Sequence, residues 1–336
     1  MTAQIFGTLP DGRQVTRVTL QGHGLTASII TLGASLQDLR IDGTEHPLVL
    51  GYPTLEPYLT EGVYFGAIVG RYANRIAAGE ARIAGRSYQL DRNEQGRTML
   101  HGGADGTGQR NWTIADHGPD HVSLVDHLPD GHMGFPGAML VRAFYRLMPG
   151  PVLRISVLAT ASDTTLCNFA PHSYFNLDGS DDLSGHLLHI AAQTYLPVDD
   201  HLIPVGAPAP VQGSHLDFRE PTRLADRLHG PLIDHNLCIG AQNLGSPVPV
   251  ATLQAANLSM QIETTMPGLQ VYAGDHIRPG ATGLAGRPYH RFAGIALETQ
   301  FWPDSPHHPD YPLAELRRGD VYRHITNLRF RPAAGS

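Results

Sequence analysis

The stretch Pro171-His172-Ser173-Tyr174-Phe175-Asn176-Leu177 places an imidazole, two hydroxyl groups and an amide close together, with aromatic and aliphatic side chains between them. It follows an alternating apolar run at residues 152–159, which predicts a β-strand. Polar side chains where a β-scaffold opens into a loop commonly bind small molecules. A histidine in a turn can equally be a structural hydrogen-bonding residue, so the function of this stretch depends on partners elsewhere in the chain.

The composition of the chain favours a β protein with a large hydrophobic core. Hydrophobic residues make up 41% of the 336 residues and charged residues 16%, and 37 glycines and 26 prolines are spread along the chain. Alternating runs bounded by turn residues recur at residues 14–20, 36–41, 122–125, 141–147 and 186–191. Because the sequence has no long helical periodicity, internal repeat or linker, we predict one all-β domain of mostly antiparallel strands over residues 1–336.

The charge and the cysteines of the chain limit its partners. The formal net charge is −7 and no basic block occurs, which argues against nucleic acid and anionic membrane surfaces. No apolar run reaches the ~18 residues that span a bilayer, and residues 1–7 lack the pattern of a signal peptide. Cys167 and Cys238 form neither a CxxC pair nor a metal knuckle, which favours a reducing compartment. We therefore predict a cytoplasmic protein without a membrane partner.

Several kinds of catalysis are excluded by residues that the sequence lacks. All 24 basic residues are arginine, so neither a Schiff-base lysine nor a phosphate-loop lysine is available. The sequence also has no G-x-S-x-G elbow, no G-x-G-x-x-G and no H-E-x-x-H motif. Histidine pairs such as His307-His308 lie in segments rich in turn residues, and we expect neither a functional metal nor a cofactor. Acid–base catalysis by side chains alone remains.

Two late segments carry side chains suited to such chemistry. Alternation places Gln270 and Tyr272 on one face of residues 268–272, and it places Glu298 opposite the apolar side chains of residues 295–301. A carboxylate partly enclosed by apolar residues can accept a proton from a hydroxyl group, while an imidazolium across the ligand supplies one. Carboxylates, amides and aromatic rings together suit a polyhydroxylated ligand.

Six motifs follow one another along the chain between Gly70 and Trp302. They are Gly70-Arg71-Tyr72-Ala73-Asn74-Arg75-Ile76, Leu100-His101-Gly102-Gly103, His172-Ser173-Tyr174-Phe175-Asn176-Leu177, Asp234-His235-Asn236, Pro267-Gly268-Leu269-Gln270-Val271-Tyr272 and Leu297-Glu298-Thr299-Gln300. In this order they resemble the motifs of the aldose 1-epimerase (galactose mutarotase) family. The resemblance implies a single large antiparallel β-sandwich of the galactose-mutarotase type, with the site in its open groove.

The resemblance also implies roles for individual residues. Glu298 matches the general base that removes the proton of the anomeric hydroxyl, and His172 matches the general acid that protonates the ring oxygen. His101 matches a second site histidine, which binds sugar and assists protonation. The positions implied to bind or line the substrate site are Asn74, Arg75, His101, Ser173, Tyr174, Asp234 and Gln270. Pro171 and Trp302 depart from the family's usual pattern, which bears on sugar preference and leaves the acid and the base in place.

The implied activity is interconversion of the α and β anomers of free aldoses, such as glucose or galactose, by ring opening and closure without a cofactor. The expected partner is a monosaccharide, and the protein is expected to be a monomer or a homodimer. Two alternatives are a non-catalytic sugar-binding module and an epimerase acting on a sugar phosphate. Retention of Glu298 and His172 argues against the first, whereas Arg71 and Arg75 alone do not distinguish the second.

Overall fold

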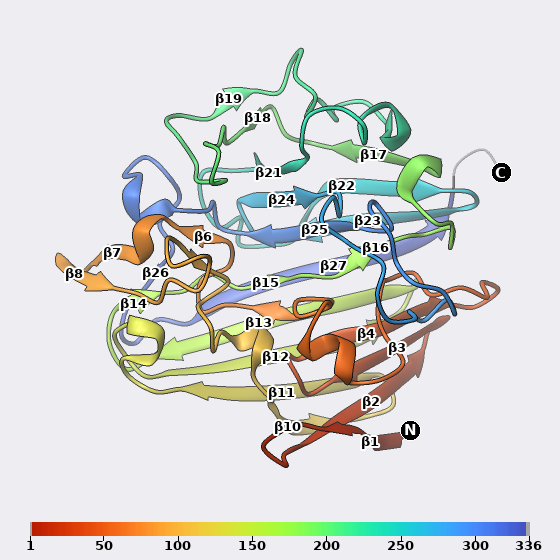
Figure 1. Ribbon diagram of the computed structural model, residues 1–336, viewed down its shortest axis with the longest axis horizontal. Coiled ribbons are helices and arrows are strands. Elements are labelled where there is room, and N and C mark those ends of the chain that lie inside the picture. Colours follow the sequence, from red (N-terminus) through yellow and green to blue (C-terminus); the bar gives the residue numbers. More distant parts are fainter. Residues whose placement is uncertain (1, 334–336) are drawn as a thin grey trace.

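The computed structural model describes residues 2–333, and antiparallel β-strands make up most of its regular structure (Figure 1). Helical structure within these residues is confined to short 3-10 turns: η1 (Glu56–Leu59), η2 (Ala77–Gly79), η3 (Thr107–Gln109), η4 (His132–Gly134), η5 (Leu183–Gly185), η6 (Leu224–Asp226) and η7 (Ser305–His307). Over the same range, no helix has the length and apolar character needed to cross a bilayer.

The largest sheet has nine strands. In spatial order they are β10 (Thr113–His117), β11 (His121–Leu128), β12 (Met139–Met148), β13 (Val152–Ala161), β27 (Tyr322–Pro332), β23 (Leu258–Thr264), β22 (Val248–Ala255), β17 (His186–Ile190) and β20 (Thr222–Arg223). Buried and accessible side chains alternate along β12, as its sequence pattern predicts for a strand with one face on a core. The strands predicted at residues 122–125, 141–147, 152–159 and 186–191 are thereby confirmed.

The second sheet has six strands and carries much of the candidate site. In spatial order they are β16 (Tyr174–Phe175), β25 (Ile295–Gln300), β24 (Gly268–Tyr272), β21 (Asp234–Cys238), β18 (Thr194–Tyr195) and β19 (Ala209–Pro210). An N-terminal sheet follows chain order, with β1 (Thr2–Thr8), β2 (Gln14–Gly22), β3 (Leu25–Ile30) and β4 (Ser35–Ile41). In Figure 1 this sheet lies at the red end of the molecule, below the blue strands β24 and β25.

Four short strand pairs form separate two-stranded sheets beside the three larger ones. They are β5 (Ile68–Val69) with β15 (Ala170–Pro171), β6 (Arg75–Ile76) with β9 (Met99–Leu100), β7 (Glu80–Ile83) with β8 (Arg86–Gln89), and β14 (Thr165–Leu166) with β26 (Glu315–Leu316). The motifs around Arg75, His101 and His172 lie on or next to the first two pairs, which therefore bring distant parts of the sequence to one place.

One large hydrophobic cluster joins the three main sheets. It contains Leu20 of β2, Val141 of β12, Leu269 of β24, Ile295 of β25 and Leu328 of β27, each at most 2% exposed. Burying a side chain of this size stabilises the fold by about 1.5–3 kcal/mol, so the packed faces hold the sheets together. The predicted all-β antiparallel sandwich is confirmed.

Candidate active site

Strand pairing aligns three polar side chains across the second sheet. Glu298 on β25 pairs with Gln270 on β24, and Gln270 pairs with Asn236 on β21. Directly paired residues in antiparallel strands point to the same face, so the carboxylate and the two amides lie in one row. All three are buried. Because β25 has a neighbouring strand on each side, the position of Glu298 is fixed by the sheet.

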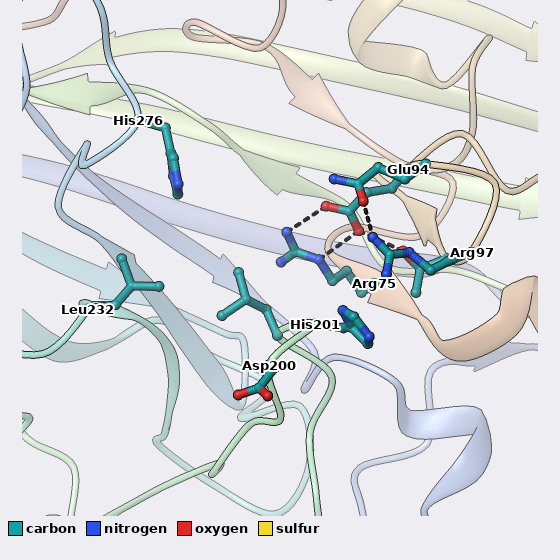
Figure 2. Close-up of a pocket in the computed structure, with 10 residues that line it drawn as sticks. Arg75, Glu94, Arg97, Asp200, His201, Leu232 and His276 are labelled. Carbon is teal, nitrogen blue, oxygen red and sulfur yellow. Dashed lines mark hydrogen bonds and ion pairs between the residues drawn. The ribbon is translucent and has the colours of Figure 1, made fainter.

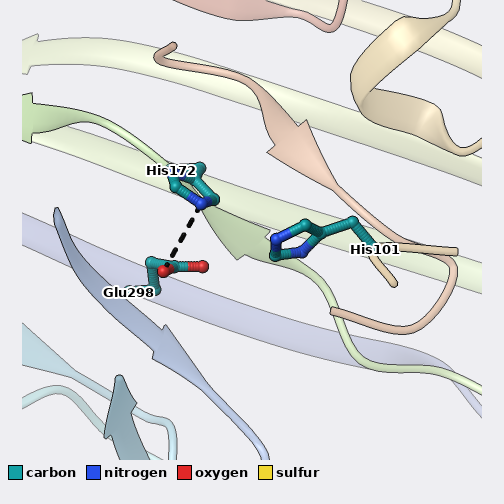
Figure 3. Close-up of side chains that lie close together, drawn as sticks. All are labelled: His101, His172 and Glu298. Atoms are coloured by element: carbon teal, nitrogen blue, oxygen red, sulfur yellow. Dashed lines mark ion pairs between the residues drawn. The ribbon is translucent and has the colours of Figure 1, made fainter. Parts of the chain in front are cut away.

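His172 is held next to Glu298 by its backbone. Its N–H donates to the Ala67 carbonyl (2.8 Å), and its carbonyl accepts from the Gly66 N–H (3.0 Å). The following strand, β16, pairs with β25. This arrangement places His172 Nε2 3.5 Å from Glu298 Oε1 (Figure 3). The imidazole and the carboxyl predicted to exchange protons with one ligand are therefore neighbours.

His101 completes the group through reciprocal hydrogen bonds with Asn74. The His101 N–H donates to the Asn74 carbonyl (3.0 Å), and the Asn74 N–H donates to His101 Nδ1 (3.2 Å). Both residues have positive φ (51° and 64°), an uncommon backbone conformation that often occurs at functional sites. Since Nδ1 accepts a hydrogen bond, the imidazole is neutral and carries its hydrogen on Nε2. The ring lies 5.1 Å from the His172 ring, between centroids (Figure 3).

Burial controls the protonation of the group. It lowers the pKa of His172 to about 4, and it lowers the pKa of His101, with further contributions from His172 and Arg75. Burial also raises the pKa of Glu298, an effect that Asp234 strengthens and Arg75 opposes. Both pKa shifts favour the uncharged form of the His172–Glu298 pair, in which Glu298 is a carboxylic acid and His172 a neutral imidazole. The carboxylate–imidazolium pair holds the same number of protons and is disfavoured.

Several polar atoms of this group lack a partner within the described chain. They are His172 Nδ1, Ser173 Oγ, Gln270 Oε1 and Glu298 Oε2, all in residues that are at most 5% exposed. Buried polar atoms are nearly always hydrogen-bonded, because an unpaired one costs about 1–3 kcal/mol. Their concentration around one pair of ionisable groups indicates a site that binds a ligand rich in hydroxyl groups.

Arg75 lines a cavity of about 460 Å³ (Figure 2). Its guanidinium donates to both carboxylate oxygens of Glu94 (2.8 Å each), and Thr98 donates to the same carboxylate (2.6 Å). The cavity is also lined by Arg97, Asp200, His201, Leu232 and His276, whereas Glu298, His172 and His101 lie outside its lining. The charge of Arg75 also acts on the buried group, since it lowers the pKa values of both Glu298 and His101.

The remaining predicted binding residues have contacts of different kinds. Asp234 accepts a hydrogen bond from Gln270 Nε2 (2.6 Å), and the Tyr174 ring lies 5.1 Å from that of His172. The side chain of Asn74 accepts from the Arg75 N–H (2.8 Å), so it also orders the local backbone. Gln270, Asp234 and Tyr174 therefore adjoin the proton-transfer pair, and Asn74 positions both Arg75 and His101.

Other residues of the central motif are structural. Asn176 donates to the carbonyls of Ser180 and Ala293 and accepts from the Gly179 N–H, which leaves it no free group for a ligand. Pro171 pairs with Ile68 in a short strand pair. Among the polar residues of the stretch 171–177, His172 and Ser173 thus have unpartnered atoms. Asn176 instead holds the turn.

The sequence analysis missed three residues of this region. Asn236 lies in the row with Glu298, although the motif Asp234-His235-Asn236 drew attention only to its aspartate. Glu94 binds Arg75, and the Tyr64 ring lies 4.7 Å from that of His101. Alternation along β21 could have identified Asn236, whereas Glu94 and Tyr64 lie in turns that carry no pattern.

The hydrogen bonding of His101 bears on metal binding. Donor atoms of His101, His172 and Glu298 lie within 4.8 Å of one another, a spacing that three ligands of one ion could have. A metal-bound imidazole normally donates its other N–H to an acceptor. His101 Nδ1 instead faces the N–H of Asn74. The donor set is therefore better suited to proton transfer than to a metal.

The absence of a side chain at Gly268 leaves room for the row of polar residues. A Cβ at this position would lie 2.4 Å from Asn236 Oδ1 and 3.0 Å from Trp302 Cδ1. We expect Gly268→Ala to lower the free energy of unfolding by about 1–3 kcal/mol, the usual cost of overpacking. Urea denaturation measures this change. The matched control is Gly22→Ala in β2, where the nearest atom would be 3.9 Å away; equal losses in both variants would contradict the explanation.

Comparisons with known proteins show which family the chain belongs to. The aldose 1-epimerase family model matches residues 16–329. Galactose mutarotase from Mus musculus is 38% identical over 343 residues, covering 98% of each chain, and aldose 1-epimerase from Escherichia coli is 34% identical over 337 residues, covering 96% of each. A crystal structure of an aldose epimerase homologue from C. elegans has a TM-score of 0.87 at 28% identity, covering 95% of this chain and 99% of its own. The chain therefore belongs to the aldose 1-epimerase family.

Proposed function

We propose that the protein is a mutarotase, which interconverts the α and β anomers of free aldoses such as glucose or galactose without a cofactor. The observation that carries the proposal is the buried His172–Glu298 pair, with 3.5 Å between its nearest nitrogen and oxygen atoms and with unpartnered polar atoms around it. Relatives that share 34–38% of their residues with the chain over nearly its whole length have names that state this activity.

The reaction needs one proton acceptor and one proton donor. Glu298 takes the proton of the anomeric hydroxyl while His172 gives a proton to the ring oxygen, so the bond between C1 and the ring oxygen breaks and an open-chain aldehyde forms. Rotation about the C1–C2 bond presents the other face of the carbonyl. Ring closure then returns both protons, and the protein is unchanged at the end of the cycle.

The substrate supplies the charge separation that the pair needs. Burial favours the uncharged pair, but a carboxylate that accepts hydrogen bonds has its charged form stabilised. Sugar hydroxyl groups that donate to the free Glu298 Oε2, together with the nearby Arg75, stabilise the carboxylate and leave the shared proton on His172. The neutral His101 donates through Nε2–H to a sugar oxygen, and Gln270 and Asp234 bind further hydroxyl groups.

Polarimetry tests the proposal and separates it from its alternatives. Freshly dissolved α-D-glucose, α-D-galactose, xylose and arabinose should each reach anomeric equilibrium faster with the protein than without it, at different rates that define its preference. A sugar-binding module would bind these sugars without changing the rate. If the protein were an epimerase for sugar phosphates, glucose 6-phosphate would inhibit it at far lower concentrations than glucose does.

The setting of the reaction follows from the chain as a whole. Residues 1–336 act as one domain, since one hydrophobic cluster joins strands from β2 to β27. The protein acts in the cytoplasm, where its two free, buried cysteines stay reduced. Its substrate is a monosaccharide, and a net charge of −7 opposes binding to nucleic acid or to an anionic membrane. The activity requires no second copy, so both a monomer and a homodimer are compatible with it.

The pH dependence of the reaction is expected to show an acid limb near pH 4. Burial lowers the pKa of His172 to about 4, so only below that pH does the pair hold two protons and lack an acceptor. Values of kcat/KM should be level from neutral pH to about pH 5 and fall about tenfold per unit below about pH 4. Circular dichroism at each pH is the control, because a depressed histidine pKa also reduces fold stability as the pH falls. An acid limb near 6.5, the ordinary histidine value, would contradict this expectation.

A further inference from the structure

The aromatic ring of Tyr64 lies against both histidines of the site. Its centroid is 4.7 Å from that of His101 and 6.0 Å from that of His172, and the two histidine rings are 5.1 Å apart. The three rings therefore form a closed triangle. Tyr64 is half-buried, whereas His101 and His172 are 7% and 5% exposed, so Tyr64 is the member of the triangle that faces solvent.

The backbone fixes Tyr64 relative to His172. The Tyr64 carbonyl accepts from the Ala67 N–H (3.1 Å), and Ala67 and Gly66 both bond to the His172 backbone. The next residue, Phe65, packs on Tyr174 with 4.7 Å between ring centroids. The segment that carries Tyr64 is thus hydrogen-bonded directly to the backbone of His172.

The contact is made by the ring and does not involve the hydroxyl group. Within the described residues, the only hydrogen-bond partner of the Tyr64 hydroxyl is Gln109 Nε2, which belongs to an exposed residue and is 3.5 Å away, at the limit of a hydrogen bond. The ring also packs on a small apolar cluster that includes Ala67, Val69 and Ala170. A phenylalanine would keep these contacts.

We propose, on the basis of the function proposed above, that Tyr64 is a positioning residue that closes His101 and His172 against solvent and thereby sets the lower pH limit of the reaction. In the proposed reaction, Glu298 and His172 transfer the protons, and Tyr64 neither gives nor takes one. Its effect arises because water excluded from the two imidazoles can no longer stabilise their charged forms.

The other groups around the histidines do not replace this effect. His172 faces the carboxyl of Glu298, the imidazole of His101 and the phenol of Tyr174. Arg75 acts on His101 and disfavours its charged form. Because burial also favours the uncharged form of Glu298, its carboxyl group does not offset the effect, and the low pKa of His172 follows from the burial of the ring. Tyr64 supplies the solvent-facing part of that burial.

Removal of the ring tests the inference. In Tyr64→Ala the acid limb of kcat/KM should move up from about 4 by at least about one pH unit, because hydration raises the histidine pKa values toward their ordinary range. Tyr64→Phe should keep the original acid limb. Tyr88→Ala is the matched control, since it removes another half-buried tyrosine, on β8, and should leave the limb in place.

A second measurement separates this inference from the proposed function. NMR titration of the imidazole C–H signals of His101 and His172, identified through His101→Asn and His172→Asn, reports both pKa values whether or not the protein is a mutarotase. The inference predicts an upward shift in Tyr64→Ala and none in Tyr64→Phe. Should Tyr64→Ala not fold, Tyr64→Leu takes its place with a smaller shift. Equal histidine pKa values in the wild-type protein and the folded variant that lacks the ring would overturn it.

Discussion

Replacing Glu298 with glutamine is expected to slow mutarotation by about 10²–10⁴-fold in kcat/KM, the usual contribution of a general base or acid. Glutamine has nearly the same shape and keeps an oxygen that accepts hydrogen bonds from sugar, but it cannot hold or release the transferred proton. Glu298 is 2% exposed on β25, which has a neighbouring strand on each side, so an isosteric change preserves the packing around it. Polarimetry with fresh α-D-glucose or α-D-galactose measures the loss.

The control for Glu298→Gln is the same change at an exposed carboxylate. Glu45 lies on the surface outside the site, and Glu45→Gln should retain wild-type turnover. Sugar binding to Glu298→Gln, measured by calorimetry, should remain within about tenfold of wild type, because the amide oxygen still accepts a hydrogen bond from the sugar in place of the carboxylate oxygen. A Glu298→Gln protein that equilibrates anomers as fast as the wild type would falsify the assignment of the base.

Replacing His172 with asparagine should lower kcat/KM by at least about 100-fold, since an amide cannot give a proton to the ring oxygen. The backbone bonds of His172 to Gly66 and Ala67 do not involve its side chain, so the turn should keep its position. The effect should fall mainly on kcat, whereas loss of a residue that only binds sugar would raise KM.

A matched control for His172→Asn is available in a turn near the N-terminus, far from His172 in the sequence. His23 is exposed and has a φ of 53°, a conformation that asparagine adopts readily, so His23→Asn should change neither stability nor rate appreciably. If His172→Asn kept more than a tenth of wild-type kcat while remaining folded, the proton donor would have to be another group.

The strands themselves could be predicted from local sequence, but their pairing could not. Residues 141–147 and 152–159 alternate and become the adjacent strands β12 and β13, which a short turn connects. β27 then inserts between β13 and β23, although it follows β23 by more than fifty residues along the chain. Such pairing depends on which apolar faces fit together in the whole molecule, and periodicity within one segment carries no information on it.

The site, like the sheets, could be predicted from the sequence only in part. Glu298 and His172 were predicted from their motifs, and the structure brings them within 3.5 Å of each other. Their protonation differs from the imidazolium–carboxylate arrangement of the sequence analysis, because the degree of burial that lowers the pKa of His172 is a property of the packed site. Tyr64 could not be found from its own segment, since its importance comes from contacts with residues more than thirty positions away.

The strand-borne residues of the site and most of the cavity wall lie in different kinds of structure. Glu298 and Gln270 belong to paired strands inside a sheet, whereas Gln95, Arg97 and His201 of the cavity wall belong to turns. Insertions and exchanges in turns leave strand registration intact. Selection acting on this chain, or a protein engineer, can therefore alter the cavity wall while Glu298 and Gln270 keep their positions in the sheet.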